Sequence, residues 1–466
     1  MTPSGTPGWA RWVVLVAAGA WVASVVIGWA VAPSLGHDEA QYALSAKDLL
    51  AGAEPRWFYV SRGMSYFAAP GVLAGGSDLA MRFVPLVTSL GFAAAAWLCA
   101  RALCGRVTAA WALAVLAAST YHVEQSSELL SDLPAAALLL AAMAILAGEL
   151  GRERIRWRVV WIAPLFAGAF YIRYASCIPI AFACAAWVVL GGRAMLRRPW
   201  PLVVAAALFV VLWLPHLLEA QRTTGSPFGI LLDSRGPASR GRGPDEPWFP
   251  YFATNPFRSY GLALAPVLAA GLFAWLPRSA RGDRRLWLAS FTALASIVVL
   301  GWVGVMQPRY VVFPVTLLAI LGVDLVRRLV ATRPPRQQTV IAAIAVAALV
   351  IATGYATSVQ AKRGARRARS MSRELAAAQA IRADRTPGVG CVVATDSYTQ
   401  LEWYTGCAAE GFASYQPFDR GEALYVVHMD DERTARPRGP GERHDTILVV
   451  PGRVTVTRVT RAPTAP

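Results

Sequence analysis

Long apolar runs separated by short polar connections cover most of the first 360 residues. The first run, residues 12–32, is long enough to cross the roughly 30 Å hydrocarbon layer of a membrane as a helix of about 20 residues. Ten further runs follow, at 81–103, 107–122, 129–148, 158–172, 175–191, 200–218, 259–276, 286–305, 310–329 and 339–358. The pattern predicts a mainly α, polytopic membrane protein with about 11 transmembrane helices.

The first apolar run has two interpretations. Arg11 before it and Ala30-Val31-Ala32 at its end resemble the flanks of a cleaved signal peptide. However, the apolar core of a signal peptide has only about 7–15 residues, and this run is longer. We therefore expect an uncleaved first membrane helix.

The pattern changes after about residue 370 to that of a soluble module. Residues 373–385 and 397–404 have helical patterns. Short apolar segments at 391–395, 424–428, 446–450 and 454–459 are typical of strands. The sequence thus predicts a transmembrane domain over 1–360 and a small α/β domain over 361–466.

Composition supports a membrane protein. Apolar residue types make up 56% of the 466 residues, more than the core of a water-soluble protein could bury. The net charge of +17 would suit a nucleic-acid partner, but the arginines lie in short clusters between the apolar runs. Such clusters select the cytoplasmic side of a membrane, so we expect membrane lipids and no nucleic acid as partners.

The basic clusters also predict a topology. With the N-terminus in the cytoplasm, every second connection is basic and lies inside: 101–106, 152–158, 193–198, 278–285 and 327–336. The first outer loop, 33–80, and the C-terminal domain then lie on the extracytoplasmic side of the plasma (inner) membrane. One segment disagrees with this topology, because five basic residues follow the last run on the outer side: Lys362, Arg363, Arg366, Arg367 and Arg369.

The six cysteines form two groups. Cys391 and Cys407 stand in the polar C-terminal part and would pair as a disulfide in an oxidising compartment. The other four lie in or beside apolar runs without CxxC spacing, where a thiol acts as a small hydrophobe: Cys99, Cys104, Cys177 and Cys184.

Ionisable residues avoid the middles of the apolar runs and gather at their outer ends. Asp38 and Glu39 follow the first run directly. Others at the same depth are Arg82, His122, Glu124, Glu128, Asp132, Arg173, His216, Glu219 and Arg309. A proton-coupled transporter needs ionisable groups near the midplane, and often shows paired broken helices. The pattern favours a catalytic site at the outer surface.

Several of these residues have a structural alternative. Asp38 could cap a helix over 39–50, with Gln41 completing a capping box and Gly52 ending the helix. Asp132 could cap the fourth run before Pro134. Tyr42 could be an aromatic residue of the membrane interface.

The cations and histidines at this depth have alternatives too. Arg173 and Arg309 could bind lipid headgroups instead of a substrate phosphate. His37, His122 and His216 could hold a divalent cation, but they lack a ligand spacing such as HExxH, so no metal site is assigned.

The string His-Asp-Glu-Ala-Gln-Tyr-Ala at 37–43 resembles the first-loop signature of the GT-C superfamily of glycosyltransferases that use polyprenyl-phosphate sugars. It is most similar to the glycosyltransferase family 39 type, which includes protein O-mannosyltransferases and lipid A aminoarabinose transferases. The resemblance covers about residues 12–330 and includes further segments at 75–83, 128–132, 171–174, 214–228 and 308–310.

This resemblance implies an enzyme that moves a sugar from a polyprenyl-phosphate carrier to a hydroxyl of a glycan, lipid or protein, with inversion, at the extracytoplasmic face. Asp38 would be the catalytic base, supported by Glu39. Candidate substrate-binding residues are Tyr42, Arg82, Asp132, Arg173, Arg309 and Tyr310. Where aminoarabinose-type members carry an acidic and a basic residue before a proline, this chain has Ala68-Ala69-Pro70, so the donor phosphate must use other cations.

Two other classes of function remain open at this point. The first is a lipid or sugar transporter, or flippase, without transfer chemistry. The second is a non-catalytic membrane scaffold. Crowding of Asp38, Asp132, Arg173 and Arg309 around one cavity would speak against the scaffold.

Overall fold

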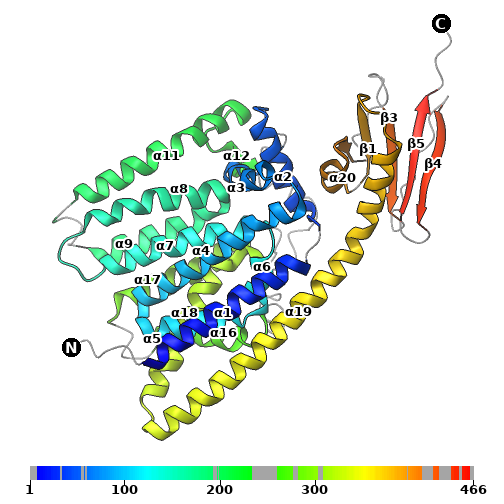
Figure 1. Cartoon of the computed structure of the whole chain (residues 1–466). Coiled ribbons are helices and arrows are strands. Elements are labelled where there is room, and N and C mark those ends of the chain that lie inside the picture. Colours follow the sequence, from blue (N-terminus) through cyan, green and yellow to red (C-terminus); the bar gives the residue numbers. More distant parts are fainter. Residues whose placement is uncertain are drawn as a thin grey trace.

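The structure is a computed structural model. It describes residues 8–31, 34–53, 57, 60–192, 197, 199–233, 260–276, 282–302, 308–395, 397–411, 423–429, 442–450 and 454–461. Parts of the predicted segments lie outside these ranges, namely 32–33, 54–56, 58–59, 193–196, 198, 259, 277–281 and 303–305. A bundle of helices carries a small sheet domain at the far end of one long helix (Figure 1). The predicted fold class, a mainly helical membrane protein with a small C-terminal α/β domain, is confirmed.

Each predicted apolar run coincides with a helix. These helices are α1 (Gly8–Val31), α4 (Asp78–Cys104), α5 (Arg106–Ala117), α7 (Asp132–Glu149), α8 (Ile162–Ile172, preceded by the 3₁₀ turn η1, Trp157–Trp161), α9 (Cys177–Gly191), α11 (Trp200–Thr224), α16 (Leu264–Leu272), α17 (Arg284–Trp302), α18 (Val312–Ala331) and α19 (Pro335–Asp384). Among the described residues, seven helices are long and apolar enough to cross a membrane. The count of 11 spans therefore stays a prediction.

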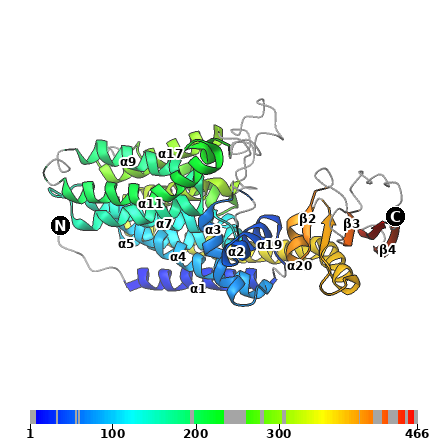
Figure 2. The same ribbon diagram turned by 90° about the horizontal axis from the view of Figure 1, so that it is seen from above.

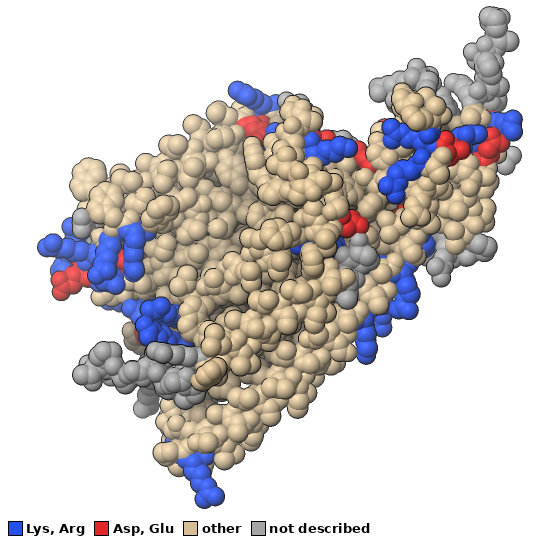
Figure 3. Space-filling model, viewed as in Figure 1, with Lys and Arg blue, Asp and Glu red and all other residues tan. Residues whose placement is uncertain are grey.

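The bundle has two polar ends. The start of α1, the end of α9 and the α18–α19 turn lie at one end, whereas α2 (His37–Leu50), α3 (Arg62–Leu73) and α12 (Gly229–Asp233) lie at the other (Figure 1). On the face shown in Figure 3, charged side chains of the described residues gather at these ends, along α19 and on the sheet domain. The broad uncharged area between them is the surface that a multi-pass membrane protein turns to lipid.

Close backbone contact fixes part of the bundle core. Helices α16 and α18 approach each other closely at two glycines. A Cβ atom on Gly271 of α16 would collide with the carbonyl oxygen of Leu318 in α18. A Cβ atom on Gly322 of α18 would collide with the carbonyl oxygen of Val267 in α16. Small residues allow membrane helices to approach in this way. This pair holds α18, and with it the turn at its outer end, against the neighbouring helix.

The first outer loop packs down onto the bundle. Helices α2 and α3 bury small and flexible side chains against α4, including Ala43, Met64, Ala68 and Met81. Gly63 at the start of α3 lies against the backbone of Tyr171 at the end of α8, where a Cβ atom would not fit. The loop is therefore a fixed cap on the outer ends of α4 and α8.

The C-terminal domain combines five strands with two helical segments. The strands are β1 (Cys391–Ala394), β2 (Ala408–Glu410), β3 (Ala423–Met429), β4 (Glu442–Val450) and β5 (Val454–Arg461), in the order β2-β1-β3-β5-β4. β1 is parallel to β2 and β3, whereas β5 is antiparallel to β3 and β4. The end of α19 packs Ala377, Ala378 and Ile381 onto the sheet, and α20 (Tyr398–Thr405) follows β1. Strand β2 was not predicted, since three residues carry almost no periodicity.

The boundary between the two domains falls inside a helix. Helix α19 has 50 residues and runs without a break across residues 360 and 361. A helix of this length spans about 75 Å at 1.5 Å per residue. It leads from the opposite end of the bundle, past the outer loops, into the sheet domain (Figures 1 and 2).

A disulfide joins Cys391 at the start of β1 to Cys407, with an S–S distance of 2.07 Å. We expect Cys407→Ser to lower the free energy of unfolding of the sheet domain by about 3 kcal/mol, because the bond restricts the unfolded chain over a short loop. Limited proteolysis of the intact protein in nanodiscs detects the loss of stability, because the sheet domain of Cys407→Ser should be cleaved faster than that of the wild type. Cys184→Ser, which removes a free thiol in α9, is the control. Equal cleavage rates for both variants would contradict the prediction.

Candidate active site

The first turn of α2 separates two adjacent acids. The helix begins after Gly36, and the Glu39 carboxylate accepts a hydrogen bond from the Gly36 N–H at 2.7 Å. Glu39 therefore occupies the reciprocal position that the sequence gave to Gln41, and the predicted capping by Asp38 is wrong. Asp38 is the second residue of the helix, so its carboxylate is free for another partner. The helix does end as predicted, with Gly52 at a φ of 69°.

Asp38 pairs with an arginine 271 positions away in the chain. The Arg309 Nη2 donates to Asp38 Oδ2 at 2.6 Å. Arg309 lies in the short turn η3 (Pro308–Val311), which precedes α18. Its Nε is also 3.9 Å from the carboxylate of Asp132, the first residue of α7. Asp132 in turn forms an ion pair with Arg173, which directly follows α8.

Four predicted site residues thus form one chain of charges, Asp38–Arg309–Asp132–Arg173. They come from four separate elements, and the helix packing brings them together at the end of the bundle that carries α2 and α3 (Figure 1). Asp132 has no side-chain capping role, because the helix α7 begins after Ser131 and the Asp132 carboxylate faces the two arginines. This crowding speaks against a purely structural scaffold.

Two tyrosines line the same cluster. The guanidinium carbon of Arg173 lies 4.6 Å from the ring centre of Tyr310, and that of Arg309 lies 5.5 Å from it. Such cation–π contacts hold an arginine without neutralising its charge. Burial raises the pKa of Tyr42, and a hydrogen bond with Ser131 opposes this only in part. The Tyr42 hydroxyl therefore stays protonated and can donate a hydrogen bond.

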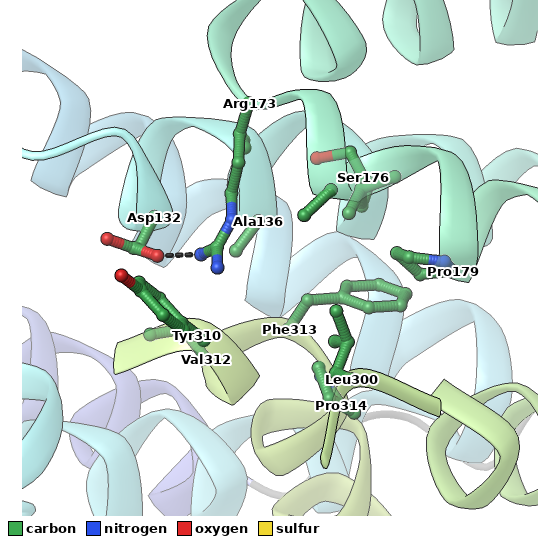
Figure 4. Close-up of a pocket in the computed structure, with 13 residues that line it drawn as sticks. Asp132, Ala136, Arg173, Ser176, Pro179, Leu300, Tyr310, Val312, Phe313 and Pro314 are labelled. Atoms are coloured by element: carbon green, nitrogen blue, oxygen red, sulfur yellow. Dashed lines mark ion pairs between the residues drawn. The ribbon is translucent and has the colours of Figure 1, made fainter. Parts of the chain in front are cut away.

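A pocket opens beside Arg173 (Figure 4). Asp132, Arg173 and Tyr310 form its polar end. Its remaining wall is mostly apolar and comes from α7, α9, α17 and α18, with Ala136, Leu139, Pro179, Leu300 and Phe313 among the lining residues. The cavity has a volume of only about 20 Å³, so it places a charged end beside an apolar wall without room for more than about one water molecule.

The two acids that contact Arg309 differ in the solvent exposure of their side chains. The side chain of Asp38 is 36% exposed, whereas that of Asp132 is 3% exposed. Asp132 already lies between two arginines and is closed to solvent. Asp38 is therefore the carboxylate that an incoming molecule can reach.

Glu39 belongs to a second, buried cluster. Its carboxylate receives hydrogen bonds from the Leu129 N–H at 2.9 Å and from Arg82 Nη1 at 3.2 Å, and it forms an ion pair with Arg367. Burial raises the pKa of Glu39, but Arg82, Arg367 and the backbone N–H groups of Gly36 and Leu129 together hold that pKa below its ordinary value. Glu39 is thus a buried carboxylate anion that connects α2, α4, α19 and the loop before α7.

Arg82 is fully enclosed in this second cluster. It is 1% exposed, and it donates to the carbonyl oxygens of Ser127 at 2.9 Å and Ser34 at 2.5 Å as well as to Glu39. Arg82 holds Ser34, just before α2, and Glu39, in the first turn of α2, in place. Contact between Arg82 and a substrate stays a prediction.

The three histidines do not share a site. His37 contacts Thr399, His122 hydrogen-bonds with Ser119 and Thr316, and His216 packs among aromatic rings. Across the ranges that the structure describes, no group of three or more His, Cys, Asp or Glu side chains is placed to hold a metal ion. The described contacts of these histidines give no support for a shared divalent-cation site.

Residues of α19 are the part of the site that the sequence did not indicate. Arg367 pairs with Glu39 and Glu128, and Arg363 pairs with Glu124. The basic segment after the last apolar run, which disagreed with the predicted topology, is thus partly neutralised by carboxylates of the outer loops. The four-residue spacing of Arg363 and Arg367 puts them on one helix face. This spacing is the signal in the sequence that could have indicated a shared acidic surface as their partner.

Comparisons with known proteins agree with this architecture. Residues 64–218 match the family model described as dolichyl-phosphate-mannose-protein mannosyltransferase. Sequence comparison with curated proteins finds no match. The structure of ArnT from Cupriavidus metallidurans bound to undecaprenyl phosphate has 15% sequence identity and a TM-score of 0.71, covering 97% of this chain and 98% of that one.

Two structures from Archaeoglobus fulgidus are also similar in fold. The apo oligosaccharyltransferase has 14% identity and a TM-score of 0.62, and the oligosaccharyltransferase AglB in complex with an inhibitory peptide and a dolichol-phosphate has 13% identity and a TM-score of 0.63. Each match covers 91% of this chain and 70% of the other. The fold is therefore shared with the ArnT and AglB structures. The family model over residues 64–218 agrees with the resemblance to the glycosyltransferase family 39 type that the sequence predicts.

Proposed function

We propose that the protein is an inverting glycosyltransferase that takes a sugar from a polyprenyl-phosphate carrier, with Asp38 as general base. The observation that carries this proposal is the contact between the exposed Asp38 carboxylate and Arg309, at 2.6 Å. A base and a phosphate-binding cation must lie on opposite sides of the anomeric carbon, so the direct contact between Asp38 and Arg309 would open when the donor binds. The chain of charges Asp38–Arg309–Asp132–Arg173 supplies both within one site.

The donor would lie with its phosphate at Arg309 and Arg173. Arginine binds phosphate through charge-assisted, often bidentate hydrogen bonds. The apolar wall beside Arg173 would meet the first units of the prenyl chain only after the cavity widens, because its volume of about 20 Å³ holds about one water molecule. The ArnT structure contains undecaprenyl phosphate and the AglB structure a dolichol-phosphate, and both ligands belong to the class of lipid proposed here.

The reaction needs one base and no added acid. The acceptor oxygen attacks the anomeric carbon as its proton passes to the Asp38 carboxylate, and the bond between that carbon and the phosphate oxygen breaks on the opposite face. The bond electrons leave with the polyprenyl phosphate, whose growing negative charge Arg309 and Arg173 stabilise. Because attack and departure occur on opposite faces, the configuration at the anomeric carbon inverts.

The site would face the extracytoplasmic side. The basic connections at 101–106, 152–158 and 327–336 lie at helix ends away from α2, in agreement with a cytoplasmic location for that end. The disulfide between Cys391 and Cys407 would form in the oxidising compartment on the other side. Non-reducing peptide mapping of native protein tests this placement, and two free thiols would count against it.

Comparison of a deletion strain with a strain that carries Asp38→Asn tests the proposed function. In both strains we expect a polyprenyl-phosphate sugar to accumulate and a glycan, lipid or protein to lose its decoration. Purified wild-type protein in nanodiscs should then release polyprenyl phosphate when given that carrier and that acceptor. Movement of the carrier across vesicles without its cleavage would instead favour a flippase.

Arg309→Gln should lower kcat/KM for the donor about 10- to 100-fold, because a hydrogen bond to a charged group contributes about 1.5–3 kcal/mol. Most of the loss should appear as a higher KM for the donor, and Arg309→Lys should restore part of it. Steady-state release of polyprenyl phosphate measures both parameters. Arg222→Gln, at the end of α11, removes an exposed cation from the same end of the bundle and is the control. A donor KM equal to that of the wild type would rule out phosphate binding by Arg309.

A further inference from the structure

The residues on both sides of Asp38 are held by the C-terminal part of the chain. His37 accepts a hydrogen bond at its carbonyl oxygen from the Thr399 hydroxyl at 3.1 Å, and its ring Nδ1 lies 3.0 Å from the same hydroxyl. Glu39 forms an ion pair with Arg367 of α19. Asp38 itself has no such partner in the C-terminal part among the contacts that the structure describes, and it faces Arg309 instead.

A third contact fixes the chain just before α2. The Tyr404 hydroxyl accepts a hydrogen bond from the Leu35 N–H at 2.7 Å and donates one to Asp78 at 2.8 Å. Thr399 and Tyr404 both belong to α20, which packs against α2 in the gap between the bundle and the sheet (Figure 1). The start of α2 is therefore held from one side by α20 and from the other by α19.

Arg367 is the charged part of this support. It reaches two carboxylates at once, Glu39 and Glu128, with 2.8 Å between Arg367 Nη1 and Glu128 Oε1. Its guanidinium also lies over Gly36, where a Cβ atom would collide with it. Without Arg367, Arg82 would be the remaining cation beside Glu39, and Glu128 would lose its ion pair. Repulsion between the Glu39 and Glu128 carboxylates would then push the first turn of α2 away from its position.

We propose that Arg367 and Thr399 are positioning residues for the transfer reaction. They fix the first turn of α2, and thereby the direction from which Asp38 meets the acceptor, so that the C-terminal domain is a working part of the active site. This inference rests on the proposed role of Asp38 as base. Displacement of a catalytic group by about 1 Å can cost about 10²-fold in rate, and a loosened α2 would produce such a displacement.

Arg367→Gln tests the proposal, with Arg363→Gln as the matched control. Arg363 lies one turn earlier on the same helix and pairs with Glu124, not with Glu39. We expect Arg367→Gln to lower kcat about 10- to 100-fold with an unchanged KM for the donor, because Arg173 and Arg309 keep their positions. Arg367→Lys should recover most of the rate, and Arg363→Gln should behave like the wild type. Equal rates for Arg367→Gln and Arg363→Gln would overturn the proposal.

The Asp38→Asn background separates positioning from a general loss of structure. If Arg367 acts through Asp38, Arg367→Gln should cause no further loss in Asp38→Asn protein. An equal fold-loss in both backgrounds would overturn the positioning role and leave the proposed function intact. Wild-type-like transfer by Asp38→Asn alone would instead overturn the proposed function.

Thr399→Val provides a second test that changes no charge. The substitution keeps the shape of the side chain and removes the hydroxyl that contacts His37. We expect a lower kcat, an unchanged donor KM and no effect in the Asp38→Asn background. If Arg367→Gln does not fold, this variant alone decides the proposal, and a wild-type kcat for Thr399→Val would then overturn it.

Discussion

Asp38→Asn should lower the rate of sugar transfer about 10²- to 10⁴-fold, the range that general-base catalysis contributes. Asparagine keeps the size of the side chain and an oxygen that can accept from Arg309, but it takes no proton from the acceptor hydroxyl. The KM for the donor should therefore change little, and the loss should appear in kcat. Single-turnover release of polyprenyl phosphate by purified protein in nanodiscs measures the chemical step directly.

Glu124→Gln is the matched control for this variant. The Glu124 side chain is 35% exposed, almost the same as the 36% of Asp38, and it pairs with Arg363 on the same side of the bundle. Among the described residues, the acids that contact Arg309 are Asp38 and Asp132, so transfer by Glu124→Gln should proceed at the wild-type rate. Asp38→Asn protein that unfolds at the wild-type temperature and still transfers sugar at the wild-type rate would remove Asp38 from the role of base.

Glu39→Gln should lower the free energy of unfolding by about 3–5 kcal/mol, the usual cost of removing one partner of a buried ion pair. The variant leaves Arg82, which is 1% exposed, without its counter-charge. Unfolding in detergent micelles, followed by loss of helical circular dichroism, measures the difference. The double variant Glu39→Gln/Arg82→Met removes both charges and should be more stable than Glu39→Gln. If it is less stable, the pair is not the source of the effect.

The pH dependence of stability gives an independent check on Glu39. Its pKa in the folded protein lies below the ordinary 4.5, because Arg82, Arg367 and two backbone N–H groups together favour the anion more than burial disfavours it. A carboxyl with a lowered pKa stabilises the fold above its ordinary pKa, and this stabilisation is lost as the pH falls through the folded value. Wild-type protein should therefore lose stability more steeply on acidification below about pH 4.5 than Glu39→Gln does. Parallel curves for the two proteins would contradict the assignment.

The position at which α2 begins decides which of the two adjacent acids, Asp38 or Glu39, is buried and which faces Arg309. Successive residues of a helix point about 100° apart, since a turn has 3.6 residues. Because α2 begins after Gly36, Glu39 turns back into the buried cluster and Asp38 turns out toward Arg309. The sequence placed both acids at the membrane face, but a helix beginning one residue later would have turned Glu39 to the position of Asp38 and Ala40 into the buried cluster.

Local patterns in the sequence determined the helical class, the positions of the apolar helices, four strands of the C-terminal domain and the first-loop motif, because each depends on neighbouring residues. Only the tertiary structure decided which charges meet. Asp38 and Arg309 are 271 positions apart, and Glu39 and Arg367 are 328 apart. Such pairs form where the packing of whole helices brings their ends together, and no local periodicity records that packing. For the same reason, the burial of Arg82 and the support of α2 by α19 and α20 became visible only in the folded chain.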